Sequence, residues 1–228
     1  MKLLAIDTST EACSAALSIN GEISERYEIA PRKHAELILP MIDELLSDAD
    51  CTLAQMDAMA FGRGPGAFTG VRIGTGVVQG LAFSVDCPVV PVSSLAAMAY
   101  GTMQELTVDN VLAGIDARMG EVYWGAYQRS IDGGVQLLGE ESVCKPDETR
   151  VPDSGAWTGA GTAWQTYEAE LSDRFSGVLK NSDSFELFPR AQHIAALGVI
   201  AVNAGLAVSA DEAQPVYLRN NVAVKKKP

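Results

Sequence analysis

A glycine-interrupted helix limits the folds open to this chain more than any other segment. Residues 56–61 are typical of a buried strand, which runs into a glycine-rich loop at 62–70 and then into a helix ending near Ser84. The helix contains four glycines, Gly70, Gly74, Gly76 and Gly80. Each costs about 0.5–1 kcal/mol of helix stability relative to alanine. We expect close packing to offset this cost, because a missing side chain lets another backbone approach.

The chain opens with a meander of short strands. Apolar and alternating stretches predict strands at 2–7, 13–19 and 22–29, and Asn20-Gly21 strongly favours a two-residue hairpin turn. The same pattern of three strands returns in the second half of the chain. Those strands are expected at 110–115, 121–128 and 135–138. The repetition predicts an α/β protein with two similar lobes.

The positions of these strands suggest where the lobes begin and end. We expect residues 1–106 to form the first lobe and 107–190 a smaller second lobe. Within the second lobe, a loop-rich stretch holds one helix around 163–175. A strongly apolar helix at 191–208 is expected to return and complete the first lobe, leaving 209–228 as a tail.

The charge balance argues against strong nucleic-acid binding by this chain alone. It has 29 acidic and 17 basic side chains among 228 residues, a net charge of −12. Nucleic-acid binders gain most of their affinity from Lys and Arg that neutralise phosphates. The tail residues Lys225, Lys226 and Lys227 are the one basic run, expected to be a solvated terminus.

Location is also suggested by composition. No apolar run reaches the 18 or more residues of a membrane span. The first apolar stretch meets Asp7 too early for a signal peptide, and the four cysteines form no C-x-x-C pair. We therefore expect a cytoplasmic protein with reduced thiols.

The predicted helix at 31–48 has an unusually wide apolar face. Its apolar residues cover roughly half the circumference, whereas a surface helix needs a stripe of about 100°. They are Leu37, Ile38, Leu39, Met41, Ile42, Leu45 and Leu46. The excess suggests a second buried face against another chain. A helix enclosed within its own lobe is an equally open interpretation.

The glycine-rich loop allows several interpretations. It lacks the Gly-Lys-Ser/Thr ending of a Walker A site. Gly62, Gly64 and Ala67 match a dinucleotide fingerprint, but Pro65 and the preceding meander do not suit that unit. Two interpretations remain open. The loop is either a tight strand-to-helix turn that permits close packing, or a helix start that receives an anion or a partner carbonyl.

Two aspartates lie at corresponding places in the two lobes. Asp7 with Thr8 and Ser9 ends the first strand, and Asp116 ends the equivalent strand of the second lobe. Such turns handle magnesium and phosphate in sugar kinases and actin. If this chain bound a nucleotide in the same way, its residues 159–162 would lie near the adenosine. However, bulky side chains occupy 117–119, where a phosphate needs close backbone approach.

Metal and nucleophile patterns are incomplete. His34 and Glu36 resemble half of a zinc motif, but the position one turn after His34 is the apolar Ile38. His193 is the only other histidine, and no G-x-S-x-G elbow occurs. We therefore predict neither a bound metal nor a catalytic residue.

Several motifs together resemble the TsaB (YeaZ) family. The resemblance runs through the whole chain and is most specific in the glycine-rich block. The matching segments are 5–9, 34–36, 62–74, 116–118 and 215–219. It implies the ASKHA fold of actin and hexokinase, with two ribonuclease-H-like lobes.

The resemblance also implies a function. TsaB-like chains are expected to be non-catalytic partners that bind and activate a TsaD-type subunit, which threonylcarbamoylates the adenosine next to the anticodon in tRNA. A TsaE-type ATPase assists, tRNA is met only through the complex, and the isolated chain pairs with itself. No cofactor is expected to be held firmly, although ATP or ADP is an open option at the subunit interface. TsaD-like chains carry paired metal histidines, whereas here Ile38 replaces the second.

Specific residues are assigned to these roles. The partner interface is expected at His34, Leu37, Ile38, Met41, Ile42, Leu45, Phe68, Arg72, Gly74, Gly76 and Gly80. The degenerate nucleotide site is expected at Asp7, Thr8, Ser9 and Asp116. On this placement, Leu45→Glu would break pairing with the catalytic subunit and leave the fold intact.

Two other functions stay open at this point. One is an autonomous ATPase or small-molecule kinase that uses Asp7 and Asp116. The other is a peptidase, suggested only by a glycoprotease name used for the wider family. Nucleotide turnover by the isolated chain would favour the first, and chelator-sensitive proteolysis would favour the second.

Overall fold

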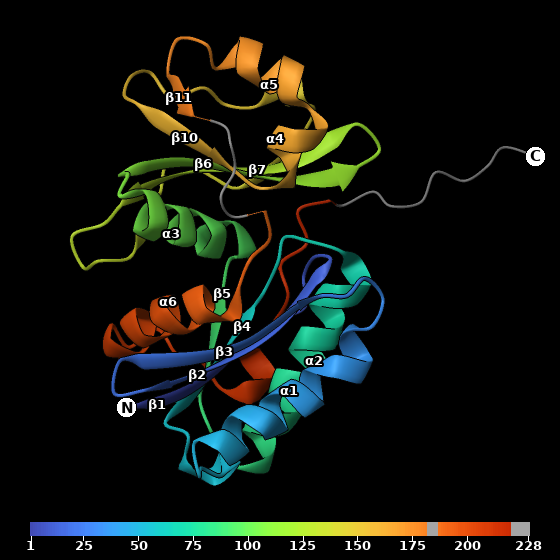
Figure 1. Ribbon diagram of the computed structural model, residues 1–228, viewed down its shortest axis with the longest axis vertical. Helices are drawn as coiled ribbons and strands as arrows, with labels where there is room; N and C mark the ends of the chain where they lie inside the picture. Colours follow the sequence, from blue (N-terminus) through green and yellow to red (C-terminus); the bar gives the residue numbers. More distant parts are fainter. Residues whose placement is uncertain (182–186, 220–228) are drawn as a thin grey trace, which may run out of the picture.

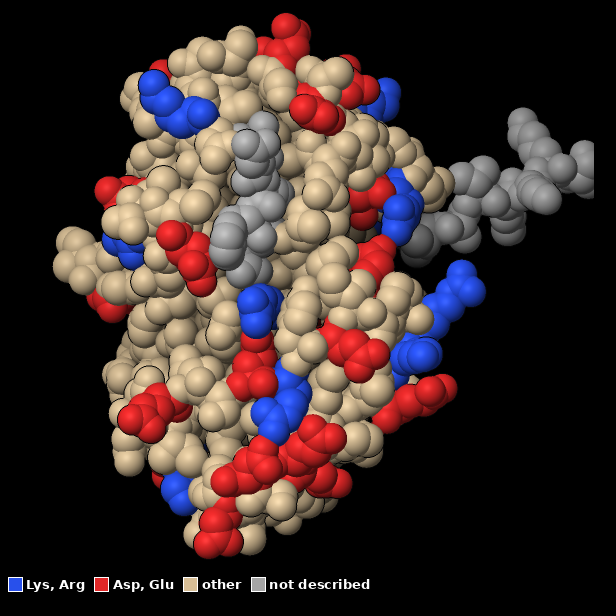
Figure 2. Space-filling view, viewed as in Figure 1, with Lys and Arg blue, Asp and Glu red and all other residues tan. Residues whose placement is uncertain are grey.

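The computed structural model describes residues 1–181 and 187–219. Two lobes are stacked along the long axis of the molecule, each built around one mixed β-sheet (Figure 1). On the face seen in Figure 2, acidic side chains gather over the lower, first lobe. Within the described ranges, no helix has the length and apolar character needed to cross a membrane.

The first sheet confirms the predicted opening meander. Its strands are β1 (Lys2–Asp7), β2 (Ala12–Ile19), β3 (Glu22–Ile29), β4 (Ala58–Gly62) and β5 (Val89–Val92), in the order β3-β2-β1-β4-β5. The first three are antiparallel, and β4 and β5 run parallel to β1. Asn20 and Gly21 have φ values of 53° and 95°, the left-handed pair that a type I′ hairpin turn requires.

The second sheet repeats this topology. Its strands are β6 (Asn110–Arg118), β7 (Glu121–Arg129), β8 (Val135–Leu137), β9 (Ser142–Cys144), β10 (Trp157–Ala160) and β11 (Leu179–Asn181). The order is β11-β10-β6-β7-β8, with β9 also paired to β7. β6 and β7 are antiparallel, and β10 runs parallel to β6, as β4 does to β1. The expected duplication is therefore confirmed.

Helices cover both faces of each sheet. They are α1 (His34–Asp48), α2 (Phe68–Ser84), α3 (Ser94–Leu106), α4 (Thr162–Thr166), α5 (Glu168–Arg174) and α6 (Ala191–Asn203), with short 3₁₀ turns at Leu53–Gln55, Pro146–Glu148 and Ala210–Glu212. α1 and α2 pack on one face of the first sheet and α6 on the other (Figure 1). α4 and α5 cover the outer face of the second sheet.

Strand alternation assigns side chains to these layers. Leu4 and Ile6 of β1 face α1 and α2, whereas Leu3 and Ala5 face α6. Because both faces are covered, β1 is apolar almost throughout, which is typical of a strand buried on both sides. α6 returns to the first sheet and buries the face that carries Leu3 and Ala5.

α3 lies between the lobes. Leu95, Met98 and Met103 pack on the second sheet with Val111, although the helix falls inside the expected first-lobe range of 1–106. Ala97 packs in the cluster beneath α6 instead. α3 is therefore shared between the lobes, and it packs against both of them.

Helix ends differ from the sequence expectations. α1 begins at His34 and not at residue 31, and α6 ends at Asn203, before the predicted end at 208. The single helix expected at 163–175 is instead two short helices, α4 and α5, separated at Tyr167, which has φ −125°. Apolar periodicity predicts the presence of a helix better than its ends.

Candidate functional site

The turn after β1 brings Asp7 to the carboxyl end of the first sheet, beside β4. The Asp7 carboxylate is buried and accepts hydrogen bonds from the Ser9 backbone N–H at 2.9 Å and from the Ser9 hydroxyl at 3.0 Å. Burial raises the pKa of the Asp7 carboxyl group from 3.8 to about 7. A Cβ placed on Gly62 would lie 1.8 Å from Asp7 Oδ2, so only glycine fits beside this carboxylate.

The glycine-rich loop packs directly onto this turn. The Thr8 hydroxyl donates to the Gly70 carbonyl at 2.7 Å, and the Ala67 N–H donates to the Ser9 carbonyl at 2.7 Å. A Cβ on Gly66 or Gly70 would lie 2.1 Å from the Ser9 or Thr8 carbonyl oxygen, respectively. The tight-turn interpretation is thus the one the structure supports. The carbonyl that meets the start of α2 belongs to this chain itself.

The four predicted nucleotide-site residues do not form one site, although Ser9 and Asp116 line the same cavity, described below. Asp7, Thr8 and Ser9 lie together, but their side chains are satisfied within the first lobe, and Ser9 also accepts from the Ser94 hydroxyl at 2.9 Å. Asp116 lies across the interlobe space, on β6. The loop at 159–162 packs inside the second lobe, where a Cβ on Gly161 would lie 2.1 Å from the Gly114 carbonyl oxygen.

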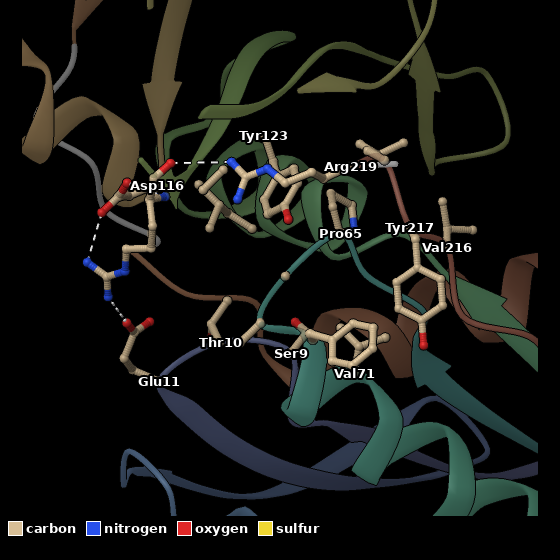
Figure 3. A pocket seen from close by; sticks show the side chains of 17 residues that line it. Ser9, Thr10, Glu11, Pro65, Val71, Asp116, Tyr123, Val216, Tyr217 and Arg219 are labelled. Carbon is tan, nitrogen blue, oxygen red and sulfur yellow. Dashed lines mark hydrogen bonds and ion pairs between the residues drawn. The ribbon is translucent and has the colours of Figure 1, made fainter. Parts of the chain in front are cut away.

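A cavity of about 300 Å³ lies between the lobes (Figure 3). Its walls come from the β1–β2 turn, the start of α2, the end of β6 and the segment near the C-terminus. Lining residues include Thr10, Glu11, Pro65, Val71, Ile115, Asp116, Tyr123, Val216 and Arg219. Neither Asp7 nor Thr8 lines it. The carboxylate expected to handle phosphate is therefore sealed away from the space a ligand would enter.

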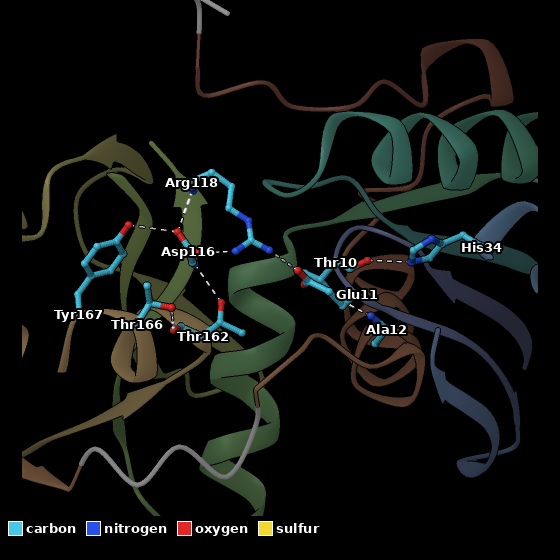
Figure 4. Close-up of polar contacts among 9 residues, drawn as sticks. All are labelled: Thr10, Glu11, Ala12, His34, Asp116, Arg118, Thr162, Thr166 and Tyr167. Atoms are coloured by element: carbon cyan, nitrogen blue, oxygen red, sulfur yellow. Dashed lines mark hydrogen bonds and ion pairs between the residues drawn. The ribbon is translucent and has the colours of Figure 1, made fainter. Parts of the chain in front are cut away.

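Asp116 is held by side chains of its own lobe, among them Arg118, which also lines the cavity. Its carboxylate accepts from the Arg118 N–H at 2.8 Å, the Arg118 guanidinium at 2.9 Å and the Tyr167 hydroxyl at 3.3 Å (Figure 4). Arg118 also forms an ion pair with Glu11 of the first lobe at 2.7 Å. Arg118 thus joins the two lobes and neutralises the carboxylates on both sides.

The histidines have structural surroundings. His34 is buried, and its Nε2 lies 2.8 Å from the Thr10 carbonyl oxygen. The His193 ring lies edge-on to Tyr100, with ring centroids 5.9 Å apart. In the described part of the chain, no group of three or more His, Cys, Asp or Glu residues could hold a metal ion.

α1 corrects the predicted interface. Leu45 is only 1% exposed, and Ile38, Met41 and Ile42 are buried with it in the core between α1 and the first sheet. The expectation that these side chains face a partner is wrong, as is the expectation that Leu45→Glu would leave the fold intact. The face of the first sheet beneath α1 covers most of the apolar side chains of this helix. Leu39 is the exposed large apolar residue of this helix.

α2 retains an exposed face. We define the α2 outer stripe as five of the exposed residues on one side of the helix, Phe68, Arg72, Gly76, Gly80 and Phe83. A Cβ on Gly76 or Gly80 would meet nothing within 4 Å, whereas a Cβ on Gly74 would lie 2.7 Å from Thr8 Oγ1. Gly74 therefore serves internal packing, and Gly76 and Gly80 leave open space.

Sequence reasoning missed Phe83, and it used residues 215–219 only as part of the family resemblance, without giving them a role. Phe83 is 84% exposed, and its spacing of three from Gly80 on the same helical face is the signal that could have found it. Tyr217 and Arg219 line the cavity, but no local pattern in the sequence predicts where an irregular segment lies. The basic residues Lys225–227 lie outside the described residues.

Comparisons with known proteins agree on one family. A family model described as "TsaD: tRNA N6-adenosine threonylcarbamoyltransferase" matches residues 26–227. The TsaB protein of Escherichia coli K12, named as a tRNA threonylcarbamoyladenosine biosynthesis protein, is 43% identical over 100% of this chain and 99% of its own. The Haemophilus influenzae protein of the same name is 42% identical over 100% and 98%. The structure of YeaZ from Pseudomonas aeruginosa superposes with a TM-score of 0.88 at 48% identity, covering 95% of this chain and 99% of that one.

The repeated topology and the cavity between the sheets define a two-lobed protein of the ASKHA class, built from two ribonuclease-H-like halves. In this protein the turn after β1 is covered by the chain's own glycine-rich loop. The chain belongs to the TsaB (YeaZ) family.

Proposed function

We propose that this chain is a non-catalytic subunit that binds and activates a TsaD-type catalytic subunit in tRNA threonylcarbamoylation. Family membership gives it a role in tRNA threonylcarbamoyladenosine biosynthesis. On this proposal, chemistry and most tRNA contact belong to the partner, and a TsaE-type ATPase assists. The acidic balance of 29 against 17 charged side chains is consistent with a chain that does not hold tRNA by itself.

The α2 outer stripe is the observation that carries the proposal. Two phenylalanines, one of them 84% exposed, flank a strip without side chains at Gly76 and Gly80. Glycines on an outer helix face let a second helix approach closely, and exposed aromatic residues are common anchors of protein interfaces. The same face would also pair two copies of this chain, so self-association and partner binding would compete.

The sealed Asp7 turn supports the non-catalytic part of the proposal. A phosphate needs free N–H groups and an accessible carboxylate with its metal, whereas here Ser9 and the α2 loop occupy both positions. We therefore place any ATP or ADP that acts with this protein at the interface with its partners. The interlobe cavity, lined by Asp116, leaves autonomous nucleotide turnover as the alternative.

The test is a reconstituted synthesis with and without this chain. TsaD-type and TsaE-type subunits, threonylcarbamoyl-adenylate, ATP and tRNA are held constant, and modified adenosine is quantified. We expect product only when this chain is present, and none from this chain alone. Full activity without it would contradict the proposal, and ATP turnover by the isolated chain would favour the alternative.

A matched pair of variants locates the docking face. Phe83→Glu places a charge in the α2 outer stripe and should reduce copurification with the catalytic subunit at least about tenfold, because buried aromatic anchors are typically worth about 2 kcal/mol or more. Ile131→Glu is the control, since Ile131 is also fully exposed but lies on the second lobe. Equal copurification of the two variants would exclude this face.

A further inference from the structure

A C-terminal segment crosses from the first lobe to the second at the mouth of the cavity (Figure 3). We call residues 213–219 the C-terminal strap. Its first half is held by the first lobe, where the Gln79 side-chain amide donates to the Ala213 carbonyl at 2.9 Å and the Val216 N–H donates to the Arg63 carbonyl at 2.8 Å. The strap is therefore a fixed part of the fold at its first-lobe end.

Tyr217 ties the strap to the α2 outer stripe. The Arg72 guanidinium donates from Nε to the Tyr217 hydroxyl at 2.9 Å, and the rings of Phe68 and Tyr217 lie 5.4 Å apart. Arg72 also lies 3.9 Å over the Phe68 ring. Tyr217 remains 41% exposed, so it extends the surface on which we place the partner.

Arg219 ties the strap to the β6–β7 turn. Its guanidinium donates to the Arg118 carbonyl at 3.3 Å and forms an ion pair with Glu121. Arg118 and Met119 have φ values of 63° and 60°, a left-handed conformation that is costly for residues other than glycine. The contacts of Arg219 and of the Arg118–Glu11 ion pair help to hold the turn in this conformation.

We propose that the C-terminal strap couples the α2 outer stripe to the β6–β7 turn, and so to the closure of the lobes around the cavity. The coupling runs through Tyr217 at one end and Arg219 at the other. A partner that covers Tyr217 and Phe68 excludes water from the Arg72–Tyr217 hydrogen bond and strengthens it, which holds Arg219 on the turn. The role of the partner in this inference rests on the proposed function.

Amide hydrogen exchange in the isolated full-length chain tests the coupling without a partner. Tyr217→Ala, which changes only the α2 end of the strap, should speed exchange in the β6–β7 turn about two- to fivefold, as should Arg219→Gln at the other end. Amides of β1 and β2 serve as the internal reference and should keep their rates. Arg26→Gln is the matched control, because it removes exposed ion pairs to Glu44 and Asp48 of the same lobe that do not touch the strap.

Three results would overturn the coupling. If Arg219→Gln speeds exchange in the turn while Tyr217→Ala leaves it at the wild-type rate, the two ends of the strap act independently. If neither variant changes the turn, Arg219 does not hold it. A rise in β1 and β2 exchange equal to that in the turn would also count against it, because it would indicate general destabilisation.

Adding the TsaD-type subunit tests the partner's role. Exchange in the β6–β7 turn should slow when the partner binds the wild-type chain, and should slow less in Tyr217→Ala at equal occupancy. Binding without protection of the turn would overturn the inference and leave the proposed function intact. Absence of binding would contradict the proposed function, while the result for the isolated chain would still stand.

Discussion

The carboxyl group of Asp7 is buried beside Gly62 and held by two hydrogen bonds from Ser9. Desolvation outweighs these bonds and raises its pKa to about 7. A carboxyl group in this setting is half protonated near neutral pH. It lies between the end of β1 and the glycine-rich loop that covers it.

Asp7→Asn should remove a specific part of the pH dependence of stability. Because the pKa of about 7 in the folded state exceeds the ordinary value of 3.8, the folded protein binds more protons than the unfolded chain between these values. Stability contributed by the neutral carboxyl group is complete below about pH 4 and is lost as the pH rises to about 7. Between about pH 5 and pH 8, the wild type should lose roughly 2–3 kcal/mol more unfolding free energy than the variant.

Urea unfolding at the two pH values measures this difference. Asp132→Asn is the control, because Asp132 is exposed and its pKa is lowered, so its carboxylate stays ionised over the whole interval. That variant should follow the wild-type pH dependence. An Asp7→Asn protein that also follows it would show that Asp7 ionises normally.

At the scale of the helix, α2 uses its glycines in two different ways. Those near its start permit contact with the Asp7 turn, and those further along leave an open stripe. Sequence reasoning treats all four alike. Only the atoms that lie next to them in the folded protein distinguish them.

Gly70→Ala and Gly76→Ala should have opposite effects on stability. A Cβ added at Gly70 would lie 2.1 Å from the Thr8 carbonyl oxygen, and we expect a loss of about 1–3 kcal/mol from the forced shift. At Gly76 the Cβ would meet nothing within 4 Å, so a gain of about 0.5–1 kcal/mol from helix propensity is expected. Thermal or urea unfolding of both variants provides the measurement, and losses of similar size at both positions would contradict the division.

α1 shows the limit of apolar periodicity. A wide apolar face predicts a helix buried on more than one side, and it left open whether a partner or the lobe itself covers each side. Ile38, Ile42 and Leu45 face the first sheet, and Leu39 is the large apolar residue of the helix that faces outward. Coverage depends on the width of the sheet beneath the helix, which periodicity does not encode.

For the whole molecule, the path of the chain makes the lobes depend on each other. α6 follows the second sheet in sequence but covers the first, where Ile194 and Ala195 pack with Leu3 and Ala60. Gly198 allows this contact, since a Cβ there would lie 2.9 Å from the Ala60 Cβ. The first lobe therefore cannot complete its core until the second lobe has been synthesised.

A fragment of residues 1–93 should accordingly fail to fold. Without α6, the face of the first sheet that carries Leu3, Ala5 and Ala60 is exposed, which removes one of its two apolar layers. We expect no cooperative thermal transition by circular dichroism. The same fragment joined by a flexible linker to residues 187–219 should regain one, and a cooperative transition in the unlinked fragment would contradict the dependence.

By itself, the sequence determined most of the elements, the duplication and the family, but it did not predict β9, β10 and β11 or the break between α4 and α5. Strand alternation, the Asn20-Gly21 turn and the glycine-rich motif are local, and they depend on residues close together in the chain. The tertiary structure alone decided that Asp7 is sealed, that Leu45 is core, and that Arg118 and Arg219 bridge the lobes. Burial and pairing depend on backbone from distant parts of the chain, and a pattern within one segment carries no information about which distant segment will cover it.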